Sequence, residues 1–418
     1  MPAATPAPLP IDAAQHGRVR VELGARSYNV DIGPGLLGRL GETVRAVLPR
    51  AARVFMIVDE NVPEPLVRRA TESLKATAAG GGAGGAGGGG VKVAGAERIL
   101  PSESAKSIAT WERCLCTMHE ARLERAEAVV AIGGGIVLDI AGFAAASHRR
   151  GVRYIACPTT LLAMVDASVG GKTGLNLVRT GKPPILAKNM LGAFHQPSAV
   201  LADIDSISSL PERELRSGLA ECIKHGLLGG TLGEPALLAD SSPLLAIGLT
   251  RPRSPLPIED LTRLITRNVA LKARVIEGDE REERETGGRA LLNLGHTFAH
   301  GLEAVEARPS SAPDPLKHGE AVALGLIAAV TCSSRLGHCD GALVNMVHAL
   351  ISQAGLPTAI APGPRAADIL AAMYADKKVI GGKLRLVLLE SAPTIRARIV
   401  SDAPHDAVLA ALAAIGAS

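Results

Sequence analysis

Three short stretches in the second half of the chain contain side chains that could bind a divalent cation. Glu221 lies in SGLAECIKHG, His296 and His300 lie in NLGHTFAHGLE, and LKHGE contains His318 and Glu320. Three such ligands with one open coordination position are typical of a catalytic metal, and Zn²⁺ binds both imidazole and carboxylate. Because His296 and His300 are four residues apart, a helix would place both on one face. Spacing alone leaves open which of these residues bind.

Basic and amide side chains are frequent in and around the same stretches. Lys172, Lys188 and Asn189 lie in two glycine-rich segments that read as loops, DASVGGKTGLN (166–176) and AKNMLGAFHQP (187–197). A single lysine is most often a solvated surface charge. Several cations beside a metal suit a substrate that carries phosphate and carboxylate groups. The candidates for this pocket are Asp166, Lys172, Lys188, Asn189, Lys224, Lys272, Arg289, Asn293, Lys377 and Lys378.

A glycine turn in the first half is a candidate nucleotide site. AVVAIGGGIVLDIAGF (128–143) predicts a buried strand, a three-glycine turn and a helix. Such a turn lets the backbone approach a diphosphate, and the helix N-terminus favours the anion. The pattern is not G-x-G-x-x-G, and a tight structural turn explains it equally well. Asp59, which ends the strand RVFMIVD, could accept hydrogen bonds from a ribose or be a solvated loop acid.

Strand and helix patterns alternate through the first half of the chain. Strands are expected at 53–59, 128–132 and 152–156, and helices at 36–48, 63–76, 104–123 and from 137. This alternation predicts a mostly parallel, doubly wound Rossmann-like sheet. Beyond residue 210 the periodicity indicates helices only, so the second half is expected to be all-α. The predicted organisation is a disordered tail (1–17), an α/β nucleotide-binding domain (18–210) and an α-helical metal- and substrate-binding domain (211–418).

Composition narrows the class of protein. The chain has 418 residues and a net charge of +4, which gives no argument for a nucleic-acid partner. No long apolar run lacks charges or breakers, so no membrane association is expected. Six scattered cysteines without a C-x-x-C pair are typical of a reduced, cytoplasmic protein.

Taken together, the motifs resemble the 3-dehydroquinate synthases, a family of sugar-phosphate cyclases. GGGIVLDIAGFAAASHRRGVRYIACPTTLLAMVDASVGGKTGLN resembles the family's signature region. AKNMLGAFHQP, ELRSGLAECIKHG, RALLNLGHTFAHGLE, KHGEAVALG and DKK resemble its later blocks in the same order. The resemblance implies a Rossmann-like N-terminal domain, an α-helical C-terminal domain and an active site in the cleft between them.

The resemblance also implies a role for individual residues. The implied metal ligands, for Zn²⁺ or Co²⁺, are Glu221, His296 and His318, which leaves His300 for substrate. The implied catalytic residues are Asp166, Lys172, Lys224, Glu285, Arg289, Asn293 and His300. The implied substrate-binding residues are Asn189, Lys272, Lys377 and, from the partner subunit of a homodimer, Arg150. The implied NAD contacts are Asp59, Glu103, Lys106, Gly134, Gly135, Ile136, Val137, Leu138, Asp139, Thr159, Thr160, Lys172, Lys188, Ser206, Ile207, Ser208 and Ser209.

The activity implied by the resemblance is a step of the shikimate pathway of aromatic amino acid biosynthesis. It converts 3-deoxy-arabino-heptulosonate 7-phosphate to 3-dehydroquinate and phosphate. Transient oxidation by NAD, phosphate elimination, re-reduction and an intramolecular aldol closure follow one another, so the enzyme is a lyase.

Three other functions compete with this interpretation. A cyclase of heptulose or hexose phosphates shares the fold, but a neutral sugar phosphate leaves Arg289 and Lys272 without the carboxylate they suit. A metal-dependent polyol dehydrogenase gives the lysine-rich pocket no role. A non-catalytic binding protein predicts the loss of a ligand or a lysine, and none is lost.

Overall fold

The computed structural model describes most of the chain. The described residues are 15–76, 90–179, 185–234, 237, 257–284, 287–306, 315–361, 363–375, 379–380, 383–391 and 394–418. Residues 1–14 of the predicted tail, and the predicted site residues Glu285 and Lys377, lie outside them.

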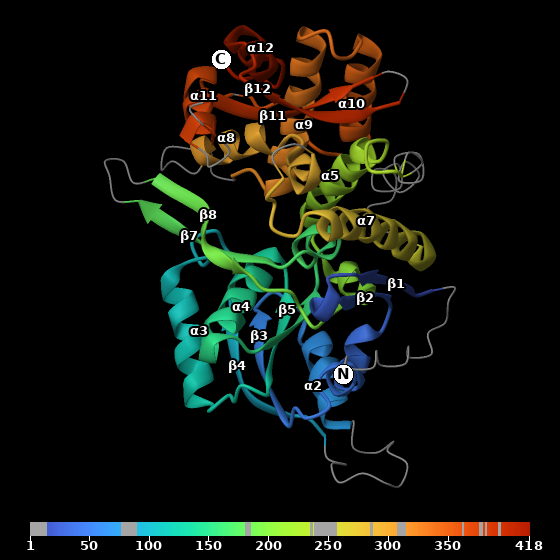
Figure 1. Ribbon diagram of the computed structural model, residues 1–418, viewed down its shortest axis with the longest axis vertical. Helices are drawn as coiled ribbons and strands as arrows, with labels where there is room; N and C mark the ends of the chain where they lie inside the picture. Colours follow the sequence, from blue (N-terminus) through green and yellow to red (C-terminus); the bar gives the residue numbers. More distant parts are fainter. Residues whose placement is uncertain are drawn as a thin grey trace. The chain divides into compact units, whose positions relative to one another are not determined.

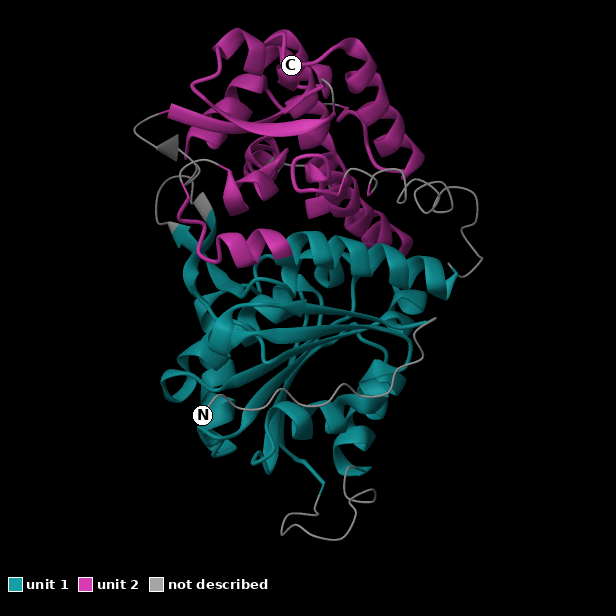
Figure 2. Ribbon diagram, turned by 45° about the vertical axis from the view of Figure 1, so that its right-hand side comes forward, with its two compact units in different colours: residues 1–179, 187–210, 257–273 teal, residues 180–186, 211–256, 274–418 magenta. Residues whose placement is uncertain are grey.

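The chain forms two compact units (Figure 2). The first comprises residues 1–179, 187–210 and 257–273, and the second comprises 180–186, 211–256 and 274–418. Helix α7 (Ile258–Gly278) therefore contributes to both. Its first half joins the first unit through close contacts, since Thr262 Oγ1 donates to the carbonyl of Gln15 at 3.2 Å. The predicted domain division at residue 210 stays a prediction.

The first unit is built on a seven-stranded sheet of order β1-β2-β9-β6-β5-β3-β4. Every neighbouring pair is parallel except β1 and β2, which confirms the predicted doubly wound fold. Its strands are β1 (Gly17–Val21), β2 (Tyr28–Gly33), β3 (Arg53–Asp59), β4 (Lys92–Ile99), β5 (Ala128–Gly133), β6 (Arg153–Pro158) and β9 (Ala199–Asp203).

Helices cover both faces of this sheet (Figure 1). Side chains alternate along β3, so Val54, Met56 and Val58 pack with the apolar faces of α1 and α2. On the other face α4 packs against β5 and β6, and Tyr154 Oη donates to Leu138 O at 3.2 Å. The helices are α1 (Leu40–Val47), α2 (Glu64–Ala76), α3 (Ile108–Glu120) and α4 (Gly135–Ser147), with the short turns η1 (Gly24–Arg26), η2 (Leu36–Arg39), η3 (His148–Arg150), η4 (Ala163–Ala167) and η5 (Ile204–Ser209).

Residues 172–176 and 187–194 of the two glycine-rich segments predicted as loops instead belong to two paired strands, and for these residues the prediction was wrong. Strands β7 (Lys172–Arg179) and β8 (Ile185–Phe194) pair as a two-stranded sheet. A Cβ on Gly174 would lie 2.6 Å from the carbonyl oxygen of Leu191, and one on Gly192 would lie 2.0 Å from that of Thr173. The glycines that suggested a loop are therefore required where the two strand backbones approach closely.

The second unit is mainly helical, and α9 is its centre. Helix α9 packs against α5, α8, α10, α12 and β11. So many elements can pack against α9 because nearly all of its residues from Gly319 to Val330 are small or apolar and buried. The helices are α5 (Glu212–Leu228), α8 (His296–Glu306), α9 (His318–Arg335), α10 (Gly341–Gln353), α11 (Ala366–Ala375) and α12 (His405–Ala414), with the short turn η6 (Gly288–Asn293).

This unit also contains an antiparallel three-stranded sheet that the sequence analysis did not anticipate. Its strands are β10 (Val379–Ile380), β11 (Lys383–Glu390) and β12 (Arg396–Ser401). The buried run of β11 is a short continuous apolar stretch, and periodicity alone does not separate such a strand from a buried helix. The unit is therefore helical with an added sheet rather than all-α.

None of the helices among the described residues has both the length and the apolar character needed to cross a membrane.

The six cysteines are all free, and only Cys116 is exposed. Burial raises the pKa of the Cys114 thiol to about 12 and those of Cys332 and Cys339 to about 11. Burial also raises the thiol pKa values of Cys157 and Cys222 well above the usual range. Since the thiolate is the reactive form, five of the six cysteines should be inert in the folded protein.

We therefore expect a thiol reagent to label one cysteine per folded chain rapidly at neutral pH. Cys116→Ser should abolish this fast phase, and full labelling should require denaturant. Mass spectrometry of the labelled peptides measures it, with Cys114→Ser as the matched control. Rapid labelling at Cys157 or Cys222 would contradict the buried arrangement.

Candidate functional site

Three predicted ligands of a metal ion meet in the second unit. Glu221 lies in the middle of α5 and is 0% exposed, while His296 and His318 are the first residues of α8 and α9. His296 Nε2 lies 3.5 Å from Glu221 Oε1, and His318 Nε2 lies 3.8 Å from the same oxygen. One ligand atom from each residue falls within 4.8 Å of the others. Three elements distant in sequence thus converge on one point.

The opposite nitrogen of each histidine is bound to the protein. His296 Nδ1 lies 3.2 Å from the carbonyl oxygen of Leu294, and His318 Nδ1 lies 3.1 Å from Glu303 Oε1. Both acceptors need a proton on Nδ1, which leaves the lone pair of a neutral ring on Nε2, toward Glu221. This is the arrangement by which proteins fix the tautomer of metal-binding histidines.

These distances fit a tetrahedral metal. With bonds of about 2.1 Å, two ligands of a tetrahedral zinc ion lie about 3.4 Å apart. The two separations from Glu221 Oε1, 3.5 and 3.8 Å, are close to that value. Imidazole nitrogen and carboxylate oxygen are also ligands that Zn²⁺ and Co²⁺ accept. The residues therefore fit a divalent cation held by three protein ligands.

The other two metal candidates have different surroundings. Glu320 forms a bidentate ion pair with Arg213, at 2.6 and 2.7 Å, and accepts the backbone N–H of Lys317. It thereby caps the helix that begins with His318, and it is absent from the cluster of possible ligands. The ring of His300 lies one turn from His296 on α8, with centroids 5.8 Å apart.

Further predicted catalytic residues lie close to the cluster in the chain. Lys224 Nζ, 1% exposed, forms an ion pair with Glu221 one turn away on α5. Arg289 and Asn293 lie on η6, which ends shortly before His296. Arg289 is buried and donates to the carbonyl of Glu280 at 2.5 Å. Asn293 Nδ2 donates to Glu282 Oε1 at 2.9 Å.

The predicted nucleotide residues of the first unit follow the carboxyl ends of parallel strands. Asp59 ends β3, Gly134–Asp139 follow β5, Thr159 and Thr160 follow β6, and Ser206–Ser209 follow β9. Ligands of doubly wound sheets bind at this edge, where the strand order reverses. That point lies between β3 and β5. From β3 the chain continues to β4 on one side, and from β5 it continues to β6 on the other.

Asp59 and the glycine turn are in direct contact at this point. Asp59 Oδ2 accepts the backbone N–H of Gly134 at 3.4 Å, and Oδ1 accepts that of Asn61 at 2.9 Å. A Cβ on Gly133 would lie 2.7 Å from Asp59 Cβ, so the first glycine is required by packing. Gly134 then caps α4, whose N-terminus faces the same edge.

Two lysine–carboxylate pairs connect distant segments of the first unit. Lys106, 6% exposed, pairs with Asp139 of α4, and Lys272 of α7 donates to Asp166 Oδ1 at 2.7 Å. Burial raises the pKa of Asp139, and the positive charge of Lys106 opposes that shift. Lys172, at the start of β7, is exposed.

The serines predicted to contact NAD are turned toward their own backbone. Ser206, Ser208 and Ser209 each donate their hydroxyl to the carbonyl three residues earlier, at 2.7 to 2.9 Å. Their backbone groups in η5 therefore remain the more direct means of contacting a nucleotide.

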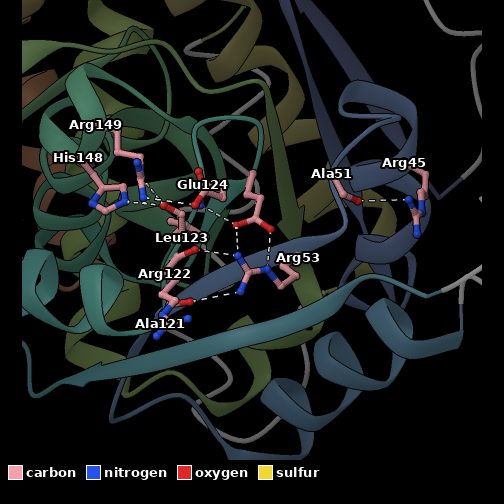
Figure 3. A network of polar contacts seen from close by, with 10 residues as sticks. Arg45, Ala51, Arg53, Ala121, Arg122, Leu123, Glu124, His148 and Arg149 are labelled. Carbon is pink, nitrogen blue, oxygen red and sulfur yellow. Dashed lines mark hydrogen bonds and ion pairs between the residues drawn. The ribbon is translucent and has the colours of Figure 1, made fainter.

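Arg150 is exposed, and the two residues before it, His148 and Arg149, take part in a polar network (Figure 3). Arg149 and Arg150 both have left-handed φ values, 50° and 64°. Both His148 Nε2, at 3.0 Å, and Arg149 Nε, at 2.8 Å, contact the carbonyl oxygen of Leu123. Such uncommon backbone conformations persist where neighbouring contacts fix them, and here they fix the position from which Arg150 extends.

The structure thus groups the predicted residues into a metal part in the second unit and a nucleotide part in the first. The predicted cleft depends on how the two units sit together and stays a prediction. Sequence reasoning missed Glu303. Its spacing of seven from His296, two helical turns along the same face of α8, was an available signal.

Comparisons with known proteins identify relatives along nearly the whole chain. Residues 97–217 match the family model of the 3-dehydroquinate synthase N-terminal domain, and residues 218–379 match that of the C-terminal domain. A 3-dehydroquinate synthase of Cereibacter sphaeroides is 40% identical over 399 residues, covering 94% of this chain and 97% of its own.

Two solved structures share the fold. One is a 2-epi-5-epi-valiolone synthase of Streptomyces hygroscopicus subsp. jinggangensis with NAD⁺ and Zn²⁺ bound. It is 26% identical to this chain, with a TM-score of 0.73, and the match covers 94% of this chain and 97% of the synthase chain. The other is a 2-deoxy-scyllo-inosose synthase with carbaglucose-6-phosphate, NAD⁺ and Co²⁺. It is 21% identical, covers 96% of this chain and all of its own, and also has a TM-score of 0.73.

The contact between Glu303 and His318 leads to a test of the metal cluster. Glu303→Ala should weaken Co²⁺ or Zn²⁺ binding by about 10- to 100-fold, because loss of a carboxylate behind a ligating histidine has that effect. Glu303→Gln keeps an acceptor for Nδ1 and should cause a smaller loss. Titration of the metal-free protein with Co²⁺, followed by its visible absorption, measures the affinity.

Glu390→Gln is the control, since Glu390 pairs with Arg398 on the surface of the same unit. An unchanged Co²⁺ affinity in Glu303→Ala would show that His318 needs no such support.

Proposed function

The chain belongs to the 3-dehydroquinate synthase family, and from this premise we propose its activity, cofactors and site residues. It converts 3-deoxy-arabino-heptulosonate 7-phosphate to 3-dehydroquinate and phosphate, as a phosphate-eliminating lyase of the shikimate pathway. The observation that carries the proposal is the convergence of Glu221, His296 and His318, with Nε2 of both histidines directed at one carboxylate.

The proposed cofactors are NAD and one divalent metal ion, Zn²⁺ or Co²⁺. When bound, NAD accepts and returns a hydride and the metal supplies Lewis acidity to the substrate oxygen. Glu221, His296 and His318 hold the metal. The carboxyl edge of the sheet, from Asp59 across Gly134–Asp139 to Thr160, holds the nucleotide, with the helix N-terminus at its diphosphate.

The lysines and the buried arginine provide the positive charge that the substrate requires. Arg289 presents a planar fork suited to a carboxylate, while Lys272 and Lys224 offer point charges for phosphate or hydroxyl oxygens. Each of these cations is at most 5% exposed, so its interaction with an anion is weakened little by water. Asp166, paired with Lys272, is well situated to move a proton.

The chain's own role in the later steps is mainly to hold the substrate in one geometry. Phosphate elimination, ring opening and aldol closure all occur on one molecule whose carboxylate and hydroxyl groups are fixed. Restricting such a molecule to a reactive conformer supplies much of the rate. The proposed substrate contacts also include Lys172, Asn189, Asn293 and His300.

The active species is proposed to be a cytoplasmic homodimer. Arg150 is exposed on a turn whose backbone is fixed by its neighbours, which suits a side chain that reaches the substrate phosphate of the partner subunit.

The runner-up is a related cyclase that acts on a heptulose phosphate. The buried guanidinium of Arg289 argues against it, because its planar donor fork suits a carboxylate, which a neutral sugar phosphate lacks. A metal-dependent polyol dehydrogenase differs in one measurable respect, since it forms NADH in proportion to turnover.

The activity is tested by phosphate release from 3-deoxy-arabino-heptulosonate 7-phosphate in the presence of NAD⁺. We expect release that a chelator abolishes and added Zn²⁺ or Co²⁺ restores, with no net NADH. The coupled appearance of 3-dehydroquinate identifies the product. Absence of release from a protein loaded with metal and NAD⁺ would reject the proposal, and net NADH would favour the dehydrogenase.

The substrate carboxylate is tested at Arg289. Arg289→Gln should raise the KM for the keto-acid phosphate by roughly 10- to 100-fold, the effect of losing a hydrogen bond between charged groups. Arg281→Gln, an exposed neighbour, should leave KM unchanged. Steady-state kinetics alongside thermal unfolding separate a binding defect from a folding defect. An unchanged KM in a folded Arg289→Gln variant would remove Arg289 from the substrate site.

A further inference from the structure

We propose that Asn176 is a positioning residue that holds the NAD-binding segment around Glu103 and the substrate-binding Asn189 in one arrangement. This inference rests on the proposed function, which gives Asn176 itself no role. Asn176 lies within β7, in a segment first read as a loop, and is 5% exposed.

Both polar atoms of the Asn176 side chain are used, each on a different segment. Oδ1 accepts the backbone N–H of Asn189 at 3.0 Å. Nδ2 donates to Glu103 Oε2 at 2.8 Å and to the Glu103 carbonyl at 3.2 Å. The Asn176 backbone N–H also donates to the carbonyl of Lys106 at 2.8 Å. One buried residue therefore connects three parts of the chain that are distant in sequence.

The bond to Asn189 fixes an uncommon backbone. Asn189 has a φ of 54°, in the left-handed region that glycine adopts readily and that is uncommon for other residues, although less so for asparagine and aspartate. In this conformation Asn189 Oδ1 accepts from Lys106 Nζ, and Lys106 in turn pairs with Asp139. The side-chain direction of Asn189 thus follows from a backbone that Asn176 holds.

The bond to Glu103 orients a carboxylate beside the same strand. Glu103 Oε2 is held by Asn176, while Oε1 lies 3.5 Å from Lys188 Nζ. Lys188 immediately precedes Asn189, so both arms of Asn176 act on one short stretch of β8. Three of the residues so connected, Glu103, Lys106 and Lys188, are among the NAD contacts that the resemblance to the family implies.

The carboxamide serves both partners at once. Glu103 accepts from its Nδ2 and the N–H of Asn189 donates to its Oδ1. Aspartate has the same size but presents acceptors alone, so it would face the Glu103 carboxylate with a second negative charge. The contact between residues 103 and 176 therefore requires a donor on one side chain and an acceptor on the other. Substitutions at both positions can exchange these two roles.

The test exchanges that pattern between the two residues. Asn176→Asp should weaken NAD⁺ binding roughly tenfold, because it replaces a hydrogen bond to a charged group by a repulsion. In the double variant Glu103→Gln/Asn176→Asp, the new amide at 103 donates to the new carboxylate. The double variant should bind NAD⁺ within about twofold of Glu103→Gln alone, since the Asn176 substitution is then compensated.

Calorimetric titration with NAD⁺ and the KM for the keto-acid phosphate are measured on the metal-loaded 418-residue chain. Asn29→Asp is the matched control, the same substitution in β2 of the same unit, where Asn29 Oδ1 accepts from Arg20. It should leave both constants unchanged. Asn176→Ala, which removes the bonds without adding charge, should shift both constants in the same direction as Asn176→Asp.

A purely structural role gives a different result. It would lower the unfolding temperature of Asn176→Asp and Asn176→Ala while leaving NAD⁺ affinity and KM within about twofold of the unmodified chain. That result would overturn the inference. So would a double variant that binds NAD⁺ no more tightly than Asn176→Asp, or failure of all three variants with a substitution at Asn176 to fold. Failure of the proposed function is separate, because it appears in the unmodified chain as absent NAD⁺ binding and absent phosphate release.

Discussion

A fully buried carboxylate is the constraint on which the second unit depends. Glu221 is 0% exposed in the middle of α5, and an isolated charge at such a position costs several kcal/mol. Lys224 on the same helix compensates it, and His296 and His318 direct their Nε2 atoms at it from two other helices. A carboxylate of this kind is stable only beside positive charge, so a bound cation would add to the charge that Lys224 supplies. The packing of α5 and α8 against α9 brings these groups together.

Close helix packing allows the ligands to meet, and it explains the glycines beside both histidines. A Cβ on Gly319, next to His318, would lie 2.0 Å from the carbonyl oxygen of Ser217 on α5. Gly295, next to His296, has a φ of 75°. A Cβ on Gly325 of α9 would lie 2.2 Å from the carbonyl oxygen of Gly295. Each histidine therefore enters its helix at a point where two backbones touch. These glycines allow the close backbone approach that brings the proposed ligands together.

The sequence allowed prediction of features with local causes and missed those that depend on tertiary pairing. The strand–turn–helix at Gly134 and the metal-binding residue types follow from periodicity and chemistry over a few residues, and both were predictable. The hairpin of β7 and β8 was not, because its glycines read as a loop until the partner backbone is known. The contact of Glu303 with His318 depends on how α8 lies against the start of α9, and the spacing of residues offered only a hint of it.

Three buried lysines share a further property, since each is already paired with a carboxylate of its own unit. Lys224 pairs with Glu221, Lys272 with Asp166, and Lys106 with Asp139. Pairing removes the cost of burying these ammonium groups and fixes their positions, so little side-chain freedom is lost when an anion binds. An anionic substrate must then compete with these carboxylates or add to them. A site built in this way gains geometric precision at the expense of raw affinity, and that exchange suits a reaction in which one substrate must be held through several successive steps.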